Sequence, residues 1–324
     1  MKIVFFGTPD YVIPILETLH KKFKSRAEKS PIVAVVTQAP KLVGRKKVLS
    51  YSPVDKWAYE KGITKYSKAV DLLQDPVLRA NHDRVLGILA AYGEILSKEV
   101  IDFFPKGIIN LHPSLLPKFR GASPVQATIL FEEKDTGLTF VKIDASLDKG
   151  QFISKLKEEV KDSDTAGSLR ERLFSRASEV LPSLLNAFMA GKIKPKQLSH
   201  YPGTFTWEIK KEDAFIPPQY LNYALNGENI EDEWRIPFIN NFSIQPTSRL
   251  LERFIRSMQP WPVAWTLLRL SLSGQTKRLK ILKAHLEEPV PNTHHLVPDL
   301  VQLEGKDPVT WRQFLEGYPN CILE

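Results

Sequence analysis

Short apolar runs alternate with amphipathic segments along the first two-thirds of the chain. The runs at residues 2–6, 32–38, 84–93 and 107–112 have the apolar composition of strands buried on both faces. Residues 168–188 instead carry apolar side chains at helical spacing. Strands that alternate with helices predict an α/β fold with a doubly wound, mainly parallel, Rossmann-like sheet.

Local signals predict where several of these elements begin and end. Thr8 has the character of an N-cap before a helix, with Pro9 as the first helical residue. Residues 52–62 repeat this pattern, with a Ser-Pro start and a final Gly62 that is expected to stop the helix. The segments 137–145 and 151–160 are predicted to pair as strands at an edge of the sheet.

The amino-acid composition changes after Lys192, where Pro, Lys and small polar residues predict a linker. Beyond it, short strand-like segments separated by turn residues are typical of a small β-barrel of the OB-like kind, preceded by a helix at 247–258. We therefore predict a first domain at 1–190, a linker at 191–206 and a C-terminal barrel domain at 207–324.

Composition places the chain among ordinary globular proteins, with 43% hydrophobic and 25% charged residues. Cys321 is the only cysteine, so an internal disulfide is excluded and a reducing compartment is favoured. We find no signal peptide and no apolar run long enough for a membrane helix. The expected location is the cytoplasm, without a membrane contact.

Positive charge is concentrated in two separate places. The formal net charge is +8, and residues 1–50 hold ten Lys or Arg against three Asp or Glu. Residues 251–283 hold seven basic residues against Glu252 alone. Two basic patches suggest a polyanion that is touched at two points. The alternative is a solvated surface that only keeps the protein soluble.

Several common catalytic and binding motifs are absent from the sequence. The turn after the first strand, "FGTPDY", lacks the glycine pattern of a dinucleotide site, and no phosphate-binding P-loop occurs. The seven histidines are scattered, so no metal site is predicted. No nucleophile elbow of a serine hydrolase is present either.

Polar side chains do occur at the end of the strand at 107–112. Asn110 and His112 alternate across one residue, so their side chains point the same way at the end of a strand. Asp148 follows the next strand and is expected to reach the same sheet edge. An amide, an imidazole and a carboxylate suit acyl transfer to an amine, in which an oxyanion develops and a proton moves. The alternative is a histidine capped by a carboxylate, with the asparagine in a turn.

The stretch "NLHPSLLPKFRGASPVQ" resembles the signature of the folate-dependent formyltransferases. "GTPDY" is similar to the first turn of that family, and "LDKG" to its catalytic-aspartate loop. "MQPWPVAWT" and "LEGKDPVTWRQFLEGYP" resemble the C-terminal domain of those members that formylate methionyl-tRNA. The similarity covers nearly the whole chain and implies a formyltransferase domain followed by a tRNA-binding barrel.

The resemblance also implies roles for individual residues. It assigns catalysis to Asn110, His112 and Asp148. It assigns folate binding to Ser114, Leu115, Leu116 and Pro117, and the lining of the pterin pocket to Tyr92, Gly93 and Ile95. Arg45 matches an arginine that steadies the acceptor end of the tRNA, and we expect tRNA to be bound also by Lys46, Lys47, Lys280 and Lys283.

The implied enzyme moves the formyl group of 10-formyltetrahydrofolate to the amine of initiator methionyl-tRNA, without a metal. It is expected to act as a monomer, and no protein partner is implied. A second hypothesis keeps the folate chemistry and changes the acceptor to water, a sugar-nucleotide amine or a purine precursor. A third is an RNA-binding protein on an inactive enzyme scaffold.

The sequence departs from the family pattern in two places. The basic loop reads "GRKK" where the family usually has a further glycine. The segment 217–246 makes the connection before the last domain longer than usual. This segment is interpreted either as a surface excursion or as an added contact for RNA or a partner.

Overall fold

The computed structural model describes residues 1–24, 30–43, 47–143, 150–197, 203–228, 230–270, 274–291 and 293–323. Internal contacts divide the chain into two compact units. Unit 1 consists of Met1–Pro117, Asp135–Glu159 and Arg170–Pro202, and unit 2 of Lys118–Lys134, Val160–Leu169 and Gly203–Glu324. The chain therefore passes between the units five times, and the predicted linker at 191–206 contains the last passage.

Unit 1 is built on an eight-stranded sheet in the order β11-β10-β9-β7-β6-β1-β2-β5. Its strands are β1 (Lys2–Phe6), β2 (Ile32–Val36), β5 (Thr64–Tyr66), β6 (Val85–Leu89), β7 (Ile108–His112), β9 (Asp135–Lys142), β10 (Gln151–Glu159) and β11 (Lys196–Gln197). The five strands from β7 to β5 are parallel, and β9 is antiparallel to both β7 and β10. The predicted α/β sheet and the antiparallel pairing of β9 with β10 are confirmed, and the short β11 lies outside this pair at the edge of the sheet.

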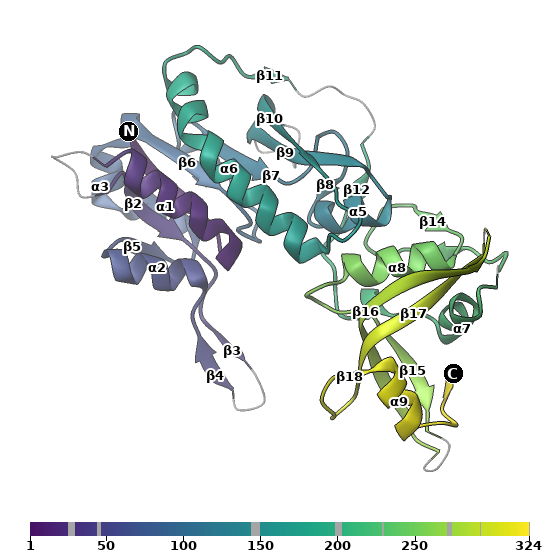
Figure 1. The fold of residues 1–324 in the computed structure, drawn as a ribbon. Helices are drawn as coiled ribbons and strands as arrows, with labels where there is room; N and C mark the ends of the chain where they lie inside the picture. The colour runs from purple at the N-terminus through teal and green to yellow at the C-terminus, as the bar shows by residue number, and fades with distance from the viewer. Residues whose placement is uncertain are drawn as a thin grey trace. The chain divides into compact units, whose positions relative to one another are not determined.

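Helices cover both faces of this sheet. The helical elements are η1 (Asp10–Val12), α1 (Ile13–Lys22), α2 (Pro53–Lys61), η2 (Ala69–Gln74), α3 (Pro76–Ala80), η3 (His82–Arg84), α4 (Lys98–Asp102) and α6 (Ala166–Met189). Apolar residues of α1, α2 and α6 form one core with the sheet, and η2, α3 and α4 supply the core of the other face. Figure 1 shows α1 and α6 lying along the same face.

Two predicted helix starts have different outcomes. The hydroxyl of Ser52 accepts a hydrogen bond from the backbone N–H of Asp55 at 3.0 Å, and Gly62 ends α2 with a φ of 65°, as predicted. The prediction for Thr8 is wrong, because its hydroxyl donates to the carbonyl of Tyr92 at 3.0 Å and caps no helix. A tertiary contact has replaced the local one.

Unit 2 contains a five-stranded antiparallel sheet in the order β18-β17-β16-β15-β19. Its strands are β15 (Trp265–Arg269), β16 (Thr276–Val290), β17 (Thr293–Leu303), β18 (Val309–Thr310) and β19 (Ile322–Leu323). The unit also contains the strand pairs β8 (Arg120–Gly121) with β12 (Phe205–Thr206) and β13 (Trp234–Arg235) with β14 (Ser243–Ile244). Its helical elements are α5 (Pro124–Leu130), η4 (Glu212–Ala214), α7 (Pro218–Asn226), α8 (Ser248–Ser257) and α9 (Trp311–Gly317). The helix predicted at 247–258 is confirmed as α8.

The segment 217–246 belongs to the core of unit 2. It forms α7, β13 and β14, and its apolar side chains are buried with those of α8. These buried side chains are Tyr220, Leu221, Ala224, Trp234, Ile236, Phe238 and Ile239. Its interpretation as a surface excursion is therefore wrong. None of the described helices of either unit is long and apolar enough to cross a membrane.

Candidate functional site

The carboxyl end of β7 carries Asn110 and His112 on one face of the sheet. They alternate with Ile109 and Leu111, which point into the core on the opposite face. His112 is 4% exposed and Asn110 is half-buried. The structure thus confirms that the two side chains share a face, as their spacing predicted.

The loop that follows His112 folds back against β9. The N–H of Ser114 donates to the carbonyl of His112 at 2.9 Å. The hydroxyl of Thr139 donates to the carbonyl of Ser114 at 2.6 Å and accepts from the N–H of Leu116 at 3.1 Å. The carbonyl of Leu116 accepts from Lys155 Nζ at 2.5 Å. Four hydrogen bonds therefore fix the loop at the backbone of Ser114 and Leu116, beside the histidine.

The side chains of this loop have different surroundings. Leu116 is 1% exposed and packs against Val141 and Phe152. Leu115 and Pro117 are half-buried, and Leu115 lies over Gly137, where an added Cβ would approach it to 2.7 Å. Neither the N–H nor the C=O of Leu115 has a hydrogen-bond partner among the described residues. Leu115 therefore offers a ligand one backbone donor and one acceptor.

Replacing Leu116 tests whether its side chain serves packing. We expect Leu116→Ser to lower the free energy of unfolding by about 2–5 kcal/mol, because a buried leucine is lost and a hydroxyl is buried in its place. Leu115→Ser should cost less, since Leu115 is only half-buried. Urea denaturation followed by circular dichroism measures both. Equal stability of Leu116→Ser and the wild type would contradict the packing role.

The loop after β6 contains the residues predicted to line a pterin pocket. The ring of Tyr92 is 1% exposed and packs edge-on against Phe6, and its hydroxyl donates to Glu94 at 3.1 Å. Burial, reinforced by the charge of Glu94, raises the pKa of the Tyr92 phenol. Gly93 has a φ of 85°, and the Ile95 side chain is 88% exposed. Tyr92 thus packs in the core, while Ile95 is accessible to a ligand.

Asp148 lies outside the described residues, so only the strand that leads to its loop can be placed. Because β9 runs antiparallel to β7, its last residues pair with the start of β7, and the N–H of Ile143 donates to the carbonyl of Ile108. The described part of β9 therefore ends beside the start of β7, at the end of that strand opposite to His112. No described residue tests the catalytic assignment of Asp148, which stays a prediction.

The predicted acceptor-end loop belongs to a hairpin of β3 (Lys41–Val43) and β4 (Val48–Ser50). Arg45 and Lys46 lie outside the described residues, and Lys47 is exposed with a φ of 48°. The exposed apolar side chains of the hairpin and its flank are Leu42, Val43, Val48, Leu49 and Tyr51. The hairpin is seen below α2 in Figure 1.

In unit 2, Lys280 and Lys283 lie on the same face of the C-terminal sheet. In a regular strand, side chains three residues apart point to opposite faces. Here Lys280 pairs with Gln302 and Lys283 with Leu300, and a bulge lies between Ile281 and Lys283. Because residues 300 and 302 share a face, the two lysines do as well. The bulge therefore gathers charges that a regular strand would separate.

An aromatic residue that the sequence did not single out lies on this face. Trp265 pairs with Lys280, and the guanidinium of Arg278 lies over its ring at 3.9 Å. The ring of Phe215 also packs against that of Trp265, with ring centroids 4.7 Å apart. Cations beside an aromatic ring are typical of surfaces that bind single-stranded or looped RNA. We call Trp265, Arg278, Lys280 and Lys283 the basic face. In the sequence, Arg278 and Lys280 belong to the basic patch at 251–283, and their alternation in a strand places them on one face.

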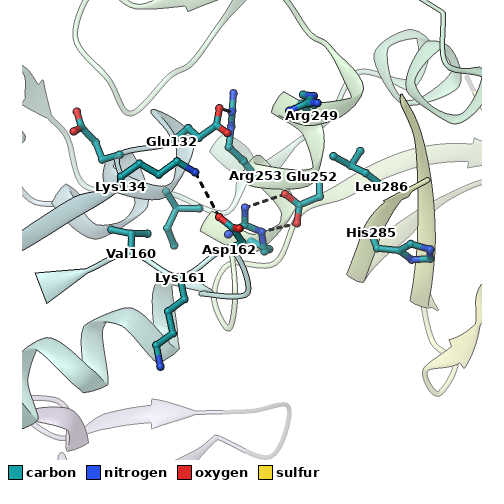
Figure 2. Close-up of a pocket in the computed structure, with 13 residues that line it drawn as sticks. Glu132, Lys134, Val160, Lys161, Asp162, Arg249, Glu252, Arg253, His285 and Leu286 are labelled. Carbon is teal, nitrogen blue, oxygen red and sulfur yellow. Dashed lines mark hydrogen bonds and ion pairs between the residues drawn. The ribbon is translucent and has the colours of Figure 1, made fainter. Parts of the chain in front are cut away.

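A polar cavity of about 450 Å³ lies within unit 2, between α8, the residues that follow α5 and the second half of β16 (Figure 2). Its charges are largely paired with one another. Arg253 binds Glu132, and Lys134 Nζ lies 3.6 Å from Asp162. Arg256 donates to Glu252 at 2.9 Å through Nη2 and to the carbonyl of Asp164 at 2.7 Å through Nη1. These pairs join α8 to segments 132–134 and 160–164.

Loss of one such pair should reduce stability. We expect Arg256→Ala to lower the free energy of unfolding by about 1–3 kcal/mol, because Glu252 is left with its 13% exposed carboxylate unpaired. The control is Arg249→Ala on the same helix, which is exposed and should stay within about 0.5 kcal/mol of the wild type. Guanidinium denaturation measures both. Equal losses in the two variants would contradict the assigned role of Arg256.

Comparisons with known proteins find relatives over most of the chain. Residues 1–185 match the family described as formyl transferase. The chain is 32% identical over 281 residues to the methionyl-tRNA formyltransferase of Bacillus subtilis, covering 86% of this chain and 77% of that protein. It is 34% identical over 269 residues to the enzyme of that name from Clostridium perfringens, covering 82% and 76%.

Two solved structures share the fold. The methionyl-tRNA formyltransferase from Clostridium thermocellum has a TM-score of 0.55 at 16% identity, over 94% of this chain and 98% of that one. A sugar 3N-formyl transferase, solved in the presence of dTDP and 5-N-formyl-THF, has a TM-score of 0.59 at 16% identity, over 95% and 99%. At this identity the likeness concerns the fold alone.

Proposed function

Because the chain belongs to the formyl transferase family, we propose that it transfers the formyl group of 10-formyltetrahydrofolate to the amine of initiator methionyl-tRNA. The observation that carries the proposal is the pair Asn110 and His112 at the end of β7, next to the fixed loop 113–117. An amide donor and an imidazole on one face can stabilise an oxyanion. The neighbouring loop supplies an apolar wall and free backbone groups for a flat ligand.

The reaction needs charge stabilisation and one proton transfer. The amine nitrogen attacks the formyl carbon, and the bond from that carbon to the folate nitrogen breaks. Asn110 and protonated His112 hold the oxygen while it is negatively charged. Asp148 keeps the imidazole charged and relays the proton that leaves the amine to the folate nitrogen. This assignment of roles uses no metal, and among the described residues no cluster of His, Cys, Asp or Glu fits one.

Two features support a tRNA as the acceptor. The basic face of unit 2 combines Trp265 with three cations, which suits phosphates and unstacked bases better than a small amine. The hairpin carrying Lys47 adds a second basic segment, in which Arg45 is proposed to position the acceptor end. The curated relatives named above are also methionyl-tRNA formyltransferases. A monomeric cytoplasmic enzyme is part of this proposal.

A comparison of acceptors tests the proposal. The protein is incubated with 10-formyltetrahydrofolate and either methionyl-tRNA or a dTDP-linked amino sugar, and the formylated products are separated by chromatography. We expect formylmethionyl-tRNA and no formylated sugar. Formylation of the sugar alone would show that the acceptor is an amino sugar and would refute the proposal. Consumption of 10-formyltetrahydrofolate without either product would indicate that the acceptor is water.

A further inference from the structure

Thr139 lies on β9 and binds the loop that follows His112. In the register of β7 and β9, Thr139 stands directly across from His112, so the two side chains share a face. Thr139 is completely buried. Its hydroxyl donates to the carbonyl of Ser114 and accepts from the N–H of Leu116. One hydroxyl thus bridges both sides of Leu115.

A second anchor acts on the same loop. Lys155, from the neighbouring strand β10, donates to the carbonyl of Leu116, and its ammonium lies 5.5 Å from the centre of the Phe152 ring. Phe152 in turn packs against Leu116. Burial, followed by the charge of Lys157, lowers the pKa of Lys155. The loop is held by polar groups of β9 and β10 as well as by apolar packing.

The bridge determines which backbone groups remain for a ligand. The hydroxyl of Thr139 engages groups of Ser114 and Leu116, whereas Leu115 between them has no hydrogen-bond partner among the described residues. The position of these open groups relative to His112 is set by the register of β7 and β9. A change at Thr139 would move the loop and leave the histidine in its strand.

We propose that Thr139 is a positioning residue, whose hydroxyl holds the loop 114–116 at a fixed place beside His112 and so aligns the formyl donor with the catalytic pair. The inference rests on the proposed function, because the loop is taken to hold the folate. Thr139 does not touch the reacting atoms in this scheme. Its effect is on alignment, and small errors of alignment have large effects on rate.

The first experiment compares Thr139→Val, Thr139→Ser and a matched control. Valine keeps the shape of threonine and removes the hydroxyl, while serine keeps the hydroxyl. The control is Thr266→Val on β15, because Thr266 is also completely buried in a strand and its hydroxyl has no hydrogen-bond partner among the described residues. Transfer kinetics are measured with the formyl donor and methionyl-tRNA varied separately, after thermal melts have established a temperature at which all variants are folded.

We expect Thr139→Val to lower kcat/KM for the formyl donor by about 10- to 100-fold, with the KM for methionyl-tRNA unchanged. Thr139→Ser should recover the donor kcat/KM to within about threefold of the wild type, and Thr266→Val should stay within about twofold. A general loss of packing would instead reduce the folded fraction and would not be rescued by serine. A donor kcat/KM for Thr139→Val within about twofold of the wild type would overturn the proposal.

Calorimetric binding of 5-formyltetrahydrofolate separates this inference from the proposed function, since it needs no acceptor. A wild type that binds this folate without formylating methionyl-tRNA would refute the proposed acceptor. The role of Thr139 would then survive if Thr139→Val bound the folate at least about tenfold more weakly. It would fail if both bound it equally. A wild type that binds no folate would overturn both proposals.

Discussion

His112→Ala is expected to reduce formyl transfer by roughly a hundredfold or more, because the imidazole stabilises charge that is present only in the transition state. Asp148→Ala should have an effect of similar size through the loss of proton transfer. Folate and tRNA binding should remain largely intact in both variants. Single-turnover transfer measures the chemical step, and equilibrium binding measures the two complexes.

The control for this pair is His82→Ala. His82 is exposed on η3, where its ring lies 5.0 Å from that of Phe103, and it takes no part in the proposed site. It should leave single-turnover transfer unchanged. Near-normal transfer by His112→Ala would show that the residue is only a buried strand-end histidine, which is the alternative that its position alone leaves open.

Replacing Lys280 and Lys283 together by alanine is expected to weaken tRNA binding and to flatten its dependence on salt. Each lost phosphate contact should lower the log–log slope by roughly one unit. The two lysines share a face, so the prediction treats them as one contact surface. Filter binding across a salt series gives the slope, and transfer at saturating tRNA should be retained.

A second double variant controls for net charge. Lys56 and Lys68 are both exposed in unit 1, and neither belongs to a predicted site. Their replacement removes the same charge and should leave the slope nearly unchanged. Equal slopes for Lys280/Lys283 and the wild type would remove the basic face from the path of the tRNA. Equal flattening by both double variants would mean that only net charge matters.

The sequence predicted those parts of the molecule that depend on local chemistry. The ends of α2 follow from Ser52 and Gly62, and the shared face of Asn110 and His112 follows from the period of a strand. The failures involve residues whose partners are distant in the chain. Thr8 caps no helix because Tyr92, 84 residues away, takes its hydroxyl. No local pattern contains that information.

The same limit explains what was missed at the site and on the basic face. The role of Thr139 depends on the register of β7 and β9, and a threonine in an apolar strand carries no sign of its partner. The common face of Lys280 and Lys283 depends on a bulge, whereas regular spacing predicts opposite faces. The segment 217–246 is longer than the corresponding connection in the formyltransferase family, yet its apolar side chains form part of the core of unit 2. A departure from a family pattern therefore did not indicate a surface position.

The most direct test of the proposed chemistry is incubation of the wild-type protein with initiator methionyl-tRNA and 10-formyltetrahydrofolate labelled in the formyl group. The amino acid is then released from the tRNA and analysed for formylmethionine. We predict labelled formylmethionine in the wild-type reaction and almost none in that of His112→Ala. Absence of formylmethionine from the wild-type reaction, with folate and tRNA both bound, would contradict the assignment.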